Sequence, residues 1–183
     1  MTAMMSHIQC LFLHVDYGVD DAHNKGVSKY LTAVASATNC PIHRLSLQWI
    51  DNAALSTLID ELKRSALGSK RTALLICGSH LEDQVTVCSL EALLEGFDVH
   101  LLCDIISARD VKLKPVLLQR LFQAGAVPSS LRQFIYMWQT AETDQHMSET
   151  LRNLLENYDS EFAVRQRWSS CCKMNPISIE NAF

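Results

Sequence analysis

The stretch that most constrains the fold is the apolar run Thr72–Cys77, which Gly78 and Ser79 interrupt. A continuous apolar run of this length is typical of a strand buried on both faces of a sheet. Apolar residues then recur at helical spacing as far as Gly96, and a second apolar run, Val99–Cys103, follows. A strand, a helix and a parallel strand within about thirty residues form a βαβ unit, so the sequence predicts an α/β protein.

The helix of this unit carries signals for its start and its end. Ser79 is followed three residues later by Glu82, a spacing that lets both residues satisfy backbone N–H groups of the first turn. Gly96 follows the helical pattern at a place where a left-handed conformation is often needed. We therefore expect Ser79 and Glu82 to cap the helix and Gly96 to end it.

The alternation of strands and helices continues on both sides of this unit. Further strands are predicted at 8–15 and 41–47, and further helices at 27–38, 54–62, 114–125 and 147–158. We expect a doubly wound, mostly parallel sheet of five or six strands with helices on both faces. The α/β domain is expected to span 1–140, with a C-terminal helix and tail over 141–183 that pack on the same domain or on a neighbouring subunit.

Composition narrows the classes of function. The 183 residues are 48% hydrophobic, which is enough for one domain with a sizeable core. The net charge of −4 and the scattered Lys and Arg residues disfavour nucleic-acid binding. There is neither an apolar run of roughly twenty residues nor a signal-peptide pattern, so we expect a cytoplasmic protein that does not enter a membrane. Most of the seven cysteines lie singly in apolar segments, as reduced thiols do, and Cys171-Cys172 is a vicinal pair.

The order of these motifs resembles the isochorismatase-like cysteine hydrolases, which include nicotinamidases, carbamoyl-amide hydrolases and isochorismatase. The resemblance rests on the spacing between Gly78 and Gly96 and on the segment Asp104–Asp110 after the second strand of the unit. It extends to Leu11–Asp16, which resembles the first strand with the family's catalytic aspartate. Leu121–Ala126 resembles the helix end before the last core strand. The resemblance implies a Rossmann-like three-layer fold.

The resemblance also bears on an ambiguous segment. Phe134–Trp138 has the composition of a strand. The family pattern instead makes Ala126–Pro128 a short strand and Ser130 the cap of a helix. The apolar residues from 131 to 138 also satisfy helical spacing, so we predict a helix there.

The family's nucleophile is missing from this chain. In the family a cysteine lies six residues after the glycine matched to Gly78 and twelve before the one matched to Gly96, and both counts arrive at Gln84. An amide cannot attack a carbonyl or nitrile carbon as a thiolate does. Cys88 lies one turn deeper on the same helix face. We expect it to be a buried apolar cysteine, and a relocated nucleophile is the alternative.

The family's lysine has no match either. The segment Cys40–Trp49 runs almost directly into the next helix, so the long loop that carries the lysine is absent. His43 and Arg44 lie nearest to the expected place, but an arginine stays protonated and cannot relay a proton. The same loop carries the metal ligands of nicotinamidases, so no metal and no other cofactor is expected.

Asp16 is the residue that most readily suggests function. It ends the first predicted strand, and ligands bind outside the carboxyl ends of strands in open α/β sheets. Its alternative role is to cap the loop into the next helix. Gln84 occupies the nucleophile position and Arg44 the place nearest the lysine. The residues expected to bind a small-molecule ligand are Gly78, Ser79, His80 and Trp49.

The missing thiol and the missing lysine together predict a non-catalytic isochorismatase-like protein with a binding or interaction role. The alternative is a hydrolase without a thiol, as in isochorismatase itself. There, Asp16 would protonate a vinyl ether as general acid, and Gln84 or backbone amides would orient the substrate. The apolar stripe at 147–158 is difficult to leave exposed to water. The resemblance implies that the chain assembles with copies of itself, because members of the family commonly form dimers or larger assemblies, so we expect a homo-oligomer.

Overall fold

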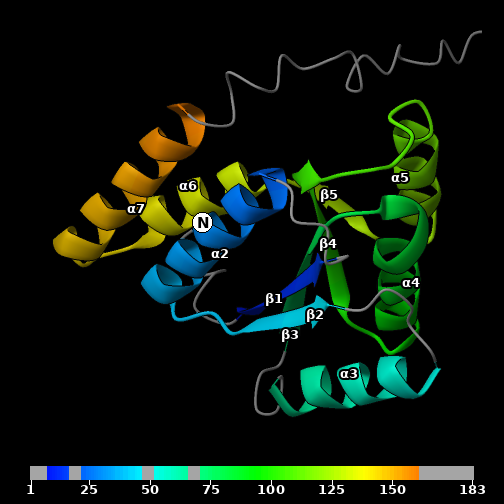
Figure 1. Cartoon of the computed structure of the whole chain (residues 1–183). Helices are drawn as coiled ribbons and strands as arrows, with labels where there is room; N and C mark the ends of the chain where they lie inside the picture. Colours follow the sequence, from blue (N-terminus) through cyan, green and yellow to red (C-terminus); the bar gives the residue numbers. More distant parts are fainter. Residues whose placement is uncertain (1–7, 17–21, 47–51, 66–70, 161–183) are drawn as a thin grey trace, which may run out of the picture.

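The computed structural model describes residues 8–16, 22–46, 52–65 and 71–160. Within these residues, five parallel strands form one sheet with helices on both faces (Figure 1). The order β2-β1-β3-β4-β5 confirms the doubly wound parallel sheet. The strands are β1 Ile8–Asp16, β2 Ile42–Ser46, β3 Arg71–Gly78, β4 Asp98–Ile106 and β5 Val127–Ser129.

The helices form two layers, with α2, α6 and α7 on one face of the sheet and α3, α4 and α5 on the other (Figure 1). A short π-helical turn, η1, leads directly into α4. The helical segments are α2 Ala22–Thr38, α3 Asn52–Ser65, η1 Leu81–Val85, α4 Thr86–Leu94, α5 Lys114–Gln123, α6 Leu131–Ala141 and α7 Gln145–Tyr158.

The core lies along the central strands β1 and β3. Leu74, Leu75 and Ile76 are fully buried, as the continuous apolar run predicts for a strand covered on both faces. On the α2 side, Phe12 meets the ring of Trp138 edge-on at a centroid distance of 6.1 Å. Aromatic rings therefore join β1 to α6 across this layer.

The segment of ambiguous composition is helical. The Ser130 hydroxyl accepts a hydrogen bond from the Gln133 backbone N–H at 3.0 Å, which caps α6. Phe134 and Ile135 are buried on its inner face. The prediction of a helix from 131 is confirmed because the buried stripe, not β-propensity, decides the conformation.

The predicted cap of the helix after β3 is wrong. The residue before η1 is His80, with φ 61°, and it makes no side-chain cap. Glu82 Oε1 instead accepts from the Asp110 N–H at 2.9 Å, and the Ser79 N–H donates to Val15 O at 3.0 Å. Glu82 and Ser79 therefore form hydrogen bonds with the loop after β4 and with β1, and not with each other's backbone N–H groups as a helix cap requires. Gly96 ends α4 with φ +83°, as predicted.

The last described helix, α7, packs against α2 and α6. The apolar stripe expected to face another subunit packs against its own chain instead: Leu151 and Tyr158 are buried, and Tyr158 meets Tyr30 of α2 edge-on at 5.9 Å. The tail 161–183 lies outside the described residues. Among the helices of the described segments, none has the length and apolar character needed to cross a membrane.

Candidate functional site

The candidate site lies where the strand order of the sheet reverses. Strand β2 lies on one side of β1 and β3 lies on the other, so the direction in which successive strands are added reverses at β1. Open α/β sheets bind ligands at such a switch point. Here Val15 of β1 pairs with Gly78 of β3, and Asp16 pairs with Ser46 of β2. The backbone of Asp16 therefore stands at the carboxyl edge, as expected. Its side chain, and Trp49, lie outside the described residues.

Gly78 fixes the shape of this edge. Its φ is +134°, and a Cβ placed there would lie 1.9 Å from the carbonyl oxygen of Val15. The next N–H, of Ser79, donates to that carbonyl at 3.0 Å. On the other side, the Ser107 N–H donates to Gly78 O at 2.9 Å. The end of β3 is thus held to β1 and β4 by a turn that only glycine can form.

The turn that follows carries Gln84. His80 adopts the left-handed conformation and the Leu81 N–H donates to Ser107 O at 3.0 Å, so the chain enters η1 directly beside β4. Gln84 is 4% exposed within this π-turn. π-Turns within helices are uncommon and occur often at functional sites. A buried neutral amide therefore lies in the turn at the carboxyl edge of the sheet.

Cys88 is the cysteine of the helix that follows η1. Its side chain is fully buried in α4, and burial raises the pKa of the Cys88 thiol to about 12. Almost none of it is ionised near neutral pH. Reactive cysteines have a lowered pKa and are partly exposed, and Cys88 has neither property.

A cluster of charged and polar side chains lies beside the turn. Arg109, in the loop after β4, forms an ion pair with Asp83 at 2.7 Å. Its guanidinium also lies 3.1 Å from Nδ1 of His80. Since a guanidinium can only donate, Nδ1 accepts and the proton of neutral His80 is on Nε2. The cluster is half exposed, so its charges stand at the surface beside Gln84.

Lys114 is a residue of this edge that sequence reasoning missed. It begins α5, which packs against η1. Its ammonium donates to Cys103 O at 3.1 Å and to Ile106 O at 2.5 Å, at the end of β4. A lysine at a helix N-terminus opposes the helix dipole, and that unfavourable position was the available signal. The ammonium therefore donates to backbone carbonyls at the end of β4 and not to its own helix.

Arg44 is placed elsewhere. It extends from β2 on the side of α2, and its guanidinium donates to the Thr32 hydroxyl at 2.7 Å. The layer that contains α4 covers the other face of the sheet (Figure 1), and Gln84 belongs to η1, which leads directly into α4. His43 points from β2 to Ser65 of α3, with Nε2 2.9 Å from the hydroxyl. The structure thus gathers Gly78, Ser79, His80 and Gln84 at one edge and sets Arg44 apart from them.

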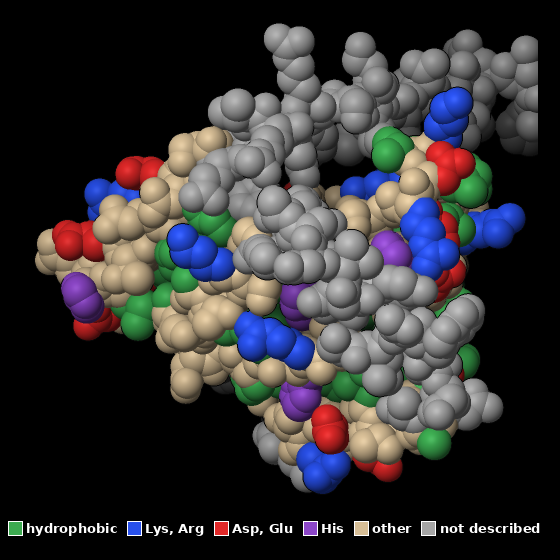
Figure 2. Space-filling view, in the orientation of Figure 1, with side chains coloured by type: hydrophobic (Ala, Val, Ile, Leu, Met, Phe, Trp, Pro, Cys, Tyr) green, Lys and Arg blue, Asp and Glu red, His purple; other side chains and the backbone are tan. Residues whose placement is uncertain are grey.

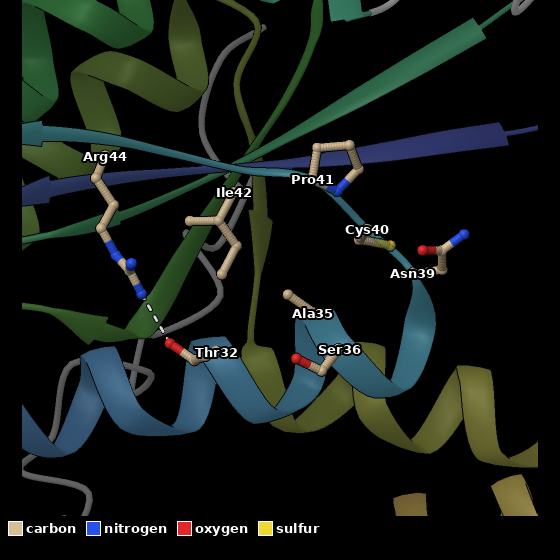
Figure 3. Close-up of a pocket in the computed structure, with 8 residues that line it drawn as sticks. All are labelled: Thr32, Ala35, Ser36, Asn39, Cys40, Pro41, Ile42 and Arg44. Carbon is tan, nitrogen blue, oxygen red and sulfur yellow. Dashed lines mark hydrogen bonds between the residues drawn. The ribbon is translucent and has the colours of Figure 1, made fainter.

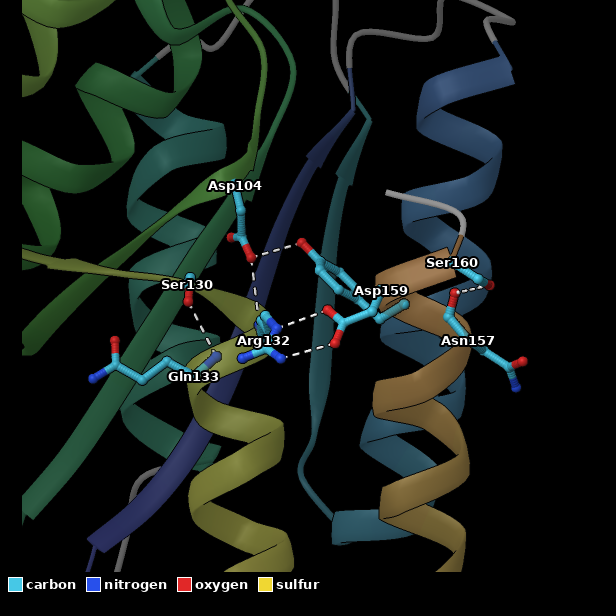
Figure 4. A network of polar contacts seen from close by, with 8 residues as sticks. Asp104, Ser130, Arg132, Gln133, Asn157, Asp159 and Ser160 are labelled. Atoms are coloured by element: carbon cyan, nitrogen blue, oxygen red, sulfur yellow. Dashed lines mark hydrogen bonds and ion pairs between the residues drawn. The ribbon is translucent and has the colours of Figure 1, made fainter. Parts of the chain in front are cut away.

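A second polar network occupies the opposite side of β4 (Figure 4). The Asp104 carboxylate accepts from the Leu131 N–H at 3.0 Å, the Arg132 N–H at 3.3 Å and the Tyr158 hydroxyl at 2.6 Å. Burial raises the pKa of Asp104, and the three donors limit the rise. Arg132 and Asp159 close the network with two bonds of 2.7 and 2.8 Å. Its geometry ties β4 to α6 and α7.

No metal centre is formed by the residues that the structure describes, since no three His, Cys, Asp or Glu side chains among them converge. Among the described residues, the side chains placed at the carboxyl edge are an amide, an imidazole, a guanidinium, an ammonium and a carboxylate, from Gln84, His80, Arg109, Lys114 and Asp83. These groups bind and orient polar ligands. None of them is an activated nucleophile.

The sheet and the turn at its carboxyl edge give the chain the fold of the isochorismatase-like hydrolases. MAR1 ribonuclease from Caenorhabditis elegans superposes with a TM-score of 0.64 at 15% identity, over 81% of this chain and 90% of that one. YcaC from Pseudomonas aeruginosa, solved with hexane-2,5-diol and covalent acrylamide, gives 0.63 at 17% identity, over 86% and 94%.

The YcaC gene product of Escherichia coli, an octameric hydrolase of unknown specificity, gives a TM-score of 0.56 at 18% identity, over 83% of this chain and 94% of that one. At these identities the likeness defines the fold. No protein-family model and no curated protein sequence matches the chain.

Proposed function

We propose that this chain is a small-molecule binding protein that uses the isochorismatase-like fold without thiol-dependent hydrolysis. The observation that carries the proposal is Gln84, a buried amide in the π-turn at the carboxyl edge. Its amide can donate and accept hydrogen bonds but has no titratable proton near neutral pH. The buried Cys88, with a pKa of about 12, supports the same conclusion.

The bound molecule is expected to be small, planar and polar. The neutral His80 and the Gln84 amide offer hydrogen bonds, and Arg109 offers a cation that suits a carboxylate or an amide oxygen. Basic side chains do not gather into a stripe on the face drawn in Figure 2, where acidic side chains lie among them. A nucleic-acid substrate, as the name of MAR1 ribonuclease suggests for that protein, is therefore not favoured.

The test uses the full chain and nicotinamide as the probe. Saturation-transfer NMR should detect nicotinamide bound to the wild type and show weaker binding to Arg109→Ala, while product formation stays at the uncatalysed rate. Turnover of nicotinamide or a carbamoyl amide that iodoacetamide or Cys88→Ser abolishes, in a protein that stays folded, would overturn the proposal.

An acid-catalysed reaction is the second candidate, because Asp16 ends β1 directly beside β3 at the switch point. In this case Asp16 protonates a vinyl ether and water completes the hydrolysis. Activity on a vinyl ether that survives Cys88→Ser and is lost in Asp16→Asn would establish this reaction in place of a binding role. No activity in either variant or in the wild type would reject it.

Self-association is a further part of the proposal. The E. coli YcaC protein is an octamer, and α4 of this chain exposes the apolar side chains of Val87, Leu90 and Leu94 along one stripe. Leu94 is 82% exposed. Sedimentation should show an oligomer for the wild type and smaller species for Leu94→Lys. A wild type that stays monomeric at high micromolar concentration would contradict self-association without touching the ligand site.

A further inference from the structure

Two cysteines lie near one another at the amino edge of the sheet, Cys10 in β1 and Cys40 in the connection just before β2. Phe12 of β1 pairs with Ile42 of β2, and the Phe12 N–H donates to Pro41 O at 2.9 Å. Carried back two residues, this register sets Cys40 opposite Cys10. Cys10 shares a face of β1 with Phe12, which contacts Trp138 of α6, and Cys40 lines a groove together with residues of α2, so both thiols lie on the α2 side. Neighbouring strands are roughly 4.8 Å apart, which lies within the Cα separation of about 4.4–6.8 Å that a disulfide bridges.

The two thiols also interact directly. Cys10 and Cys40 lie close enough for each thiol to shift the pKa of the other, and the Cys40 thiol donates to Thr38 O at 3.7 Å. Cys10 is 6% exposed, whereas Cys40 is only partly buried. The pair therefore consists of an inner thiol and an outer thiol in contact, which is the arrangement of a reactive cysteine with a resolving partner.

Cys40 opens onto a groove between α2 and β2 (Figure 3). The groove has a volume of about 280 Å³, and Cys40 and Arg44 are drawn toward opposite ends of it. Arg44 is the charged side chain among its lining residues and pairs with Thr32. A small oxidant can reach the outer thiol through this groove.

Ionisation favours the same assignment. The hydrogen bond from Cys10 lowers the pKa of Cys40 to about 7, although burial alone would raise it. The same bond raises the pKa of Cys10, and burial adds to the rise. Cys40 is thus the thiol of the pair that ionises more readily. The thiolate is the form that attacks peroxides.

We propose that Cys40 is an oxidation site and that Cys10 resolves the oxidised form to a Cys10–Cys40 disulfide. The Cys40 thiolate attacks the terminal oxygen of a hydroperoxide, the O–O bond breaks, and a sulfenic acid forms as an alcohol, or water from hydrogen peroxide, leaves after protonation. Cys10 sulfur then attacks the sulfenic sulfur, the S–O bond breaks and water leaves. Two thiols and one hydroperoxide give one disulfide, one alcohol and one water.

The disulfide would tie the edge strand β2 to the central strand β1 and close a loop that contains the whole of α2. Closing a loop of this length constrains the unfolded chain, so the oxidised protein should melt at a higher temperature than the reduced one. The bond forms at the amino edge of the sheet. It is therefore independent of the ligand site proposed at the carboxyl edge.

The test treats the full reduced chain with hydrogen peroxide, alkylates the remaining thiols and maps the peptides by mass spectrometry. The expected product is a cross-linked peptide that joins the segments of Cys10 and Cys40, about two hydrogens lighter than the separate peptides, and dithiothreitol reverses it. Cys103→Ala removes another partly exposed cysteine, on β4, and should leave the cross-link unchanged.

Cys10→Ala separates the proposal from accidental oxidation. This variant should stop at a Cys40 sulfenic acid that dimedone traps. Without the donor, alkylation of Cys40 at pH 7 should slow about threefold, because thiolate is lost but each remaining thiolate is a better nucleophile. In the wild type, the pH profile of Cys40 alkylation should have its midpoint near 7.

Two results would overturn the proposal. One is oxidation confined to Cys171 and Cys172 while Cys10 and Cys40 stay free. The other is a wild-type pH profile of Cys40 alkylation with its midpoint near the ordinary thiol value of about 8.5. Both readings come from the wild-type chain, so they decide the matter even if Cys10→Ala fails to fold.

Discussion

The two sides of the end of β4 use polar residues in opposite ways. On the α6–α7 side, Asp104 is enclosed and accepts three hydrogen bonds from two helices (Figure 4). On the η1 side, Arg109, His80 and Asp83 form a cluster of comparable size at the surface. Buried polar groups must be fully satisfied to persist, whereas exposed groups can exchange their partners for water or a ligand.

The two polar clusters at the end of β4 therefore differ in how much they contribute to the stability of the fold. The Asp104 carboxylate joins β4 to α6 and α7 through its hydrogen bonds. The Arg109 cluster holds little of the fold together, because each of its charges is half exposed. The η1 side is therefore where a ligand can be bound at low cost to stability.

The largest effect is expected on the η1 side, from backbone geometry rather than charge. In Gly78→Ala, the new Cβ meets the Val15 carbonyl and forces an L-residue to φ +134°. The free energy of unfolding should fall by more than about 3 kcal/mol in urea denaturation. Gly96→Ala is the matched control, because it also has positive φ but open space around it, and should cost about 1 kcal/mol. Equal costs would show that contact with Val15 is unimportant.

Asp104→Ala should have the next largest effect. It removes the acceptor at the start of α6 and leaves the Tyr158 hydroxyl buried without that partner. The expected loss in the free energy of unfolding is about 3 kcal/mol by denaturant titration. Asp83→Ala, at a half-exposed aspartate of the η1 side that pairs with Arg109, should cost about 0.5 kcal/mol or less. If both variants lose equally little, the proposed division between the two sides fails.

Asp104 should also give the α6–α7 side a distinct pH dependence. Burial raises its pKa, so the folded chain holds this proton more tightly than the unfolded chain. Relative to Asp104→Asn, wild-type stability should be greatest below about pH 4, near the ordinary aspartate value, and should decline as the pH rises through the raised pKa. Urea denaturation across this range measures the difference. A difference that grows with pH would mean that hydrogen bonding outweighs burial.

The smallest effects come from the two exposed arginines. Arg132 forms two hydrogen bonds with the Asp159 carboxylate. The Arg132→Ala variant should lower the free energy of unfolding by about 0.5–1 kcal/mol. Arg109→Ala should cost about 0.5 kcal/mol or less, while weakening the binding of nicotinamide. The two guanidinium groups are equally exposed. A stability loss larger for Arg109 than for Arg132 would reverse the comparison.

Sequence patterns located the elements well because burial imposes periodicity. The apolar run before Gly78 predicted the central strand β3, and the spacing from Leu131 predicted α6 against its β-rich composition. The spacing from Gly78 to Gly96 also pointed to the fold that solved structures share. The expectation for Ser79 and Glu82 failed, because the N–H of Asp110, distant in sequence, takes the carboxylate.

Side-chain partners across the sheet were beyond the reach of the sequence. Arg44 was expected near the site, but strand alternation turns it toward α2 and Thr32. Lys114 was not singled out, although it serves the end of β4. Nothing local in the sequence links Asp104 to Tyr158, or Cys10 to Cys40.

The sequence by itself determined the order of strands and helices, the glycine turn after β3 and the absence of a thiol at position 84, because these follow from local patterning and residue identity. Only the tertiary structure decided which polar groups are sealed and which stay exposed. Pairing of distant side chains depends on strand register and helix packing, which many separate contacts set together. Asp104 and Arg109 lie five residues apart in one segment, yet one is locked into the fold and the other faces the surface.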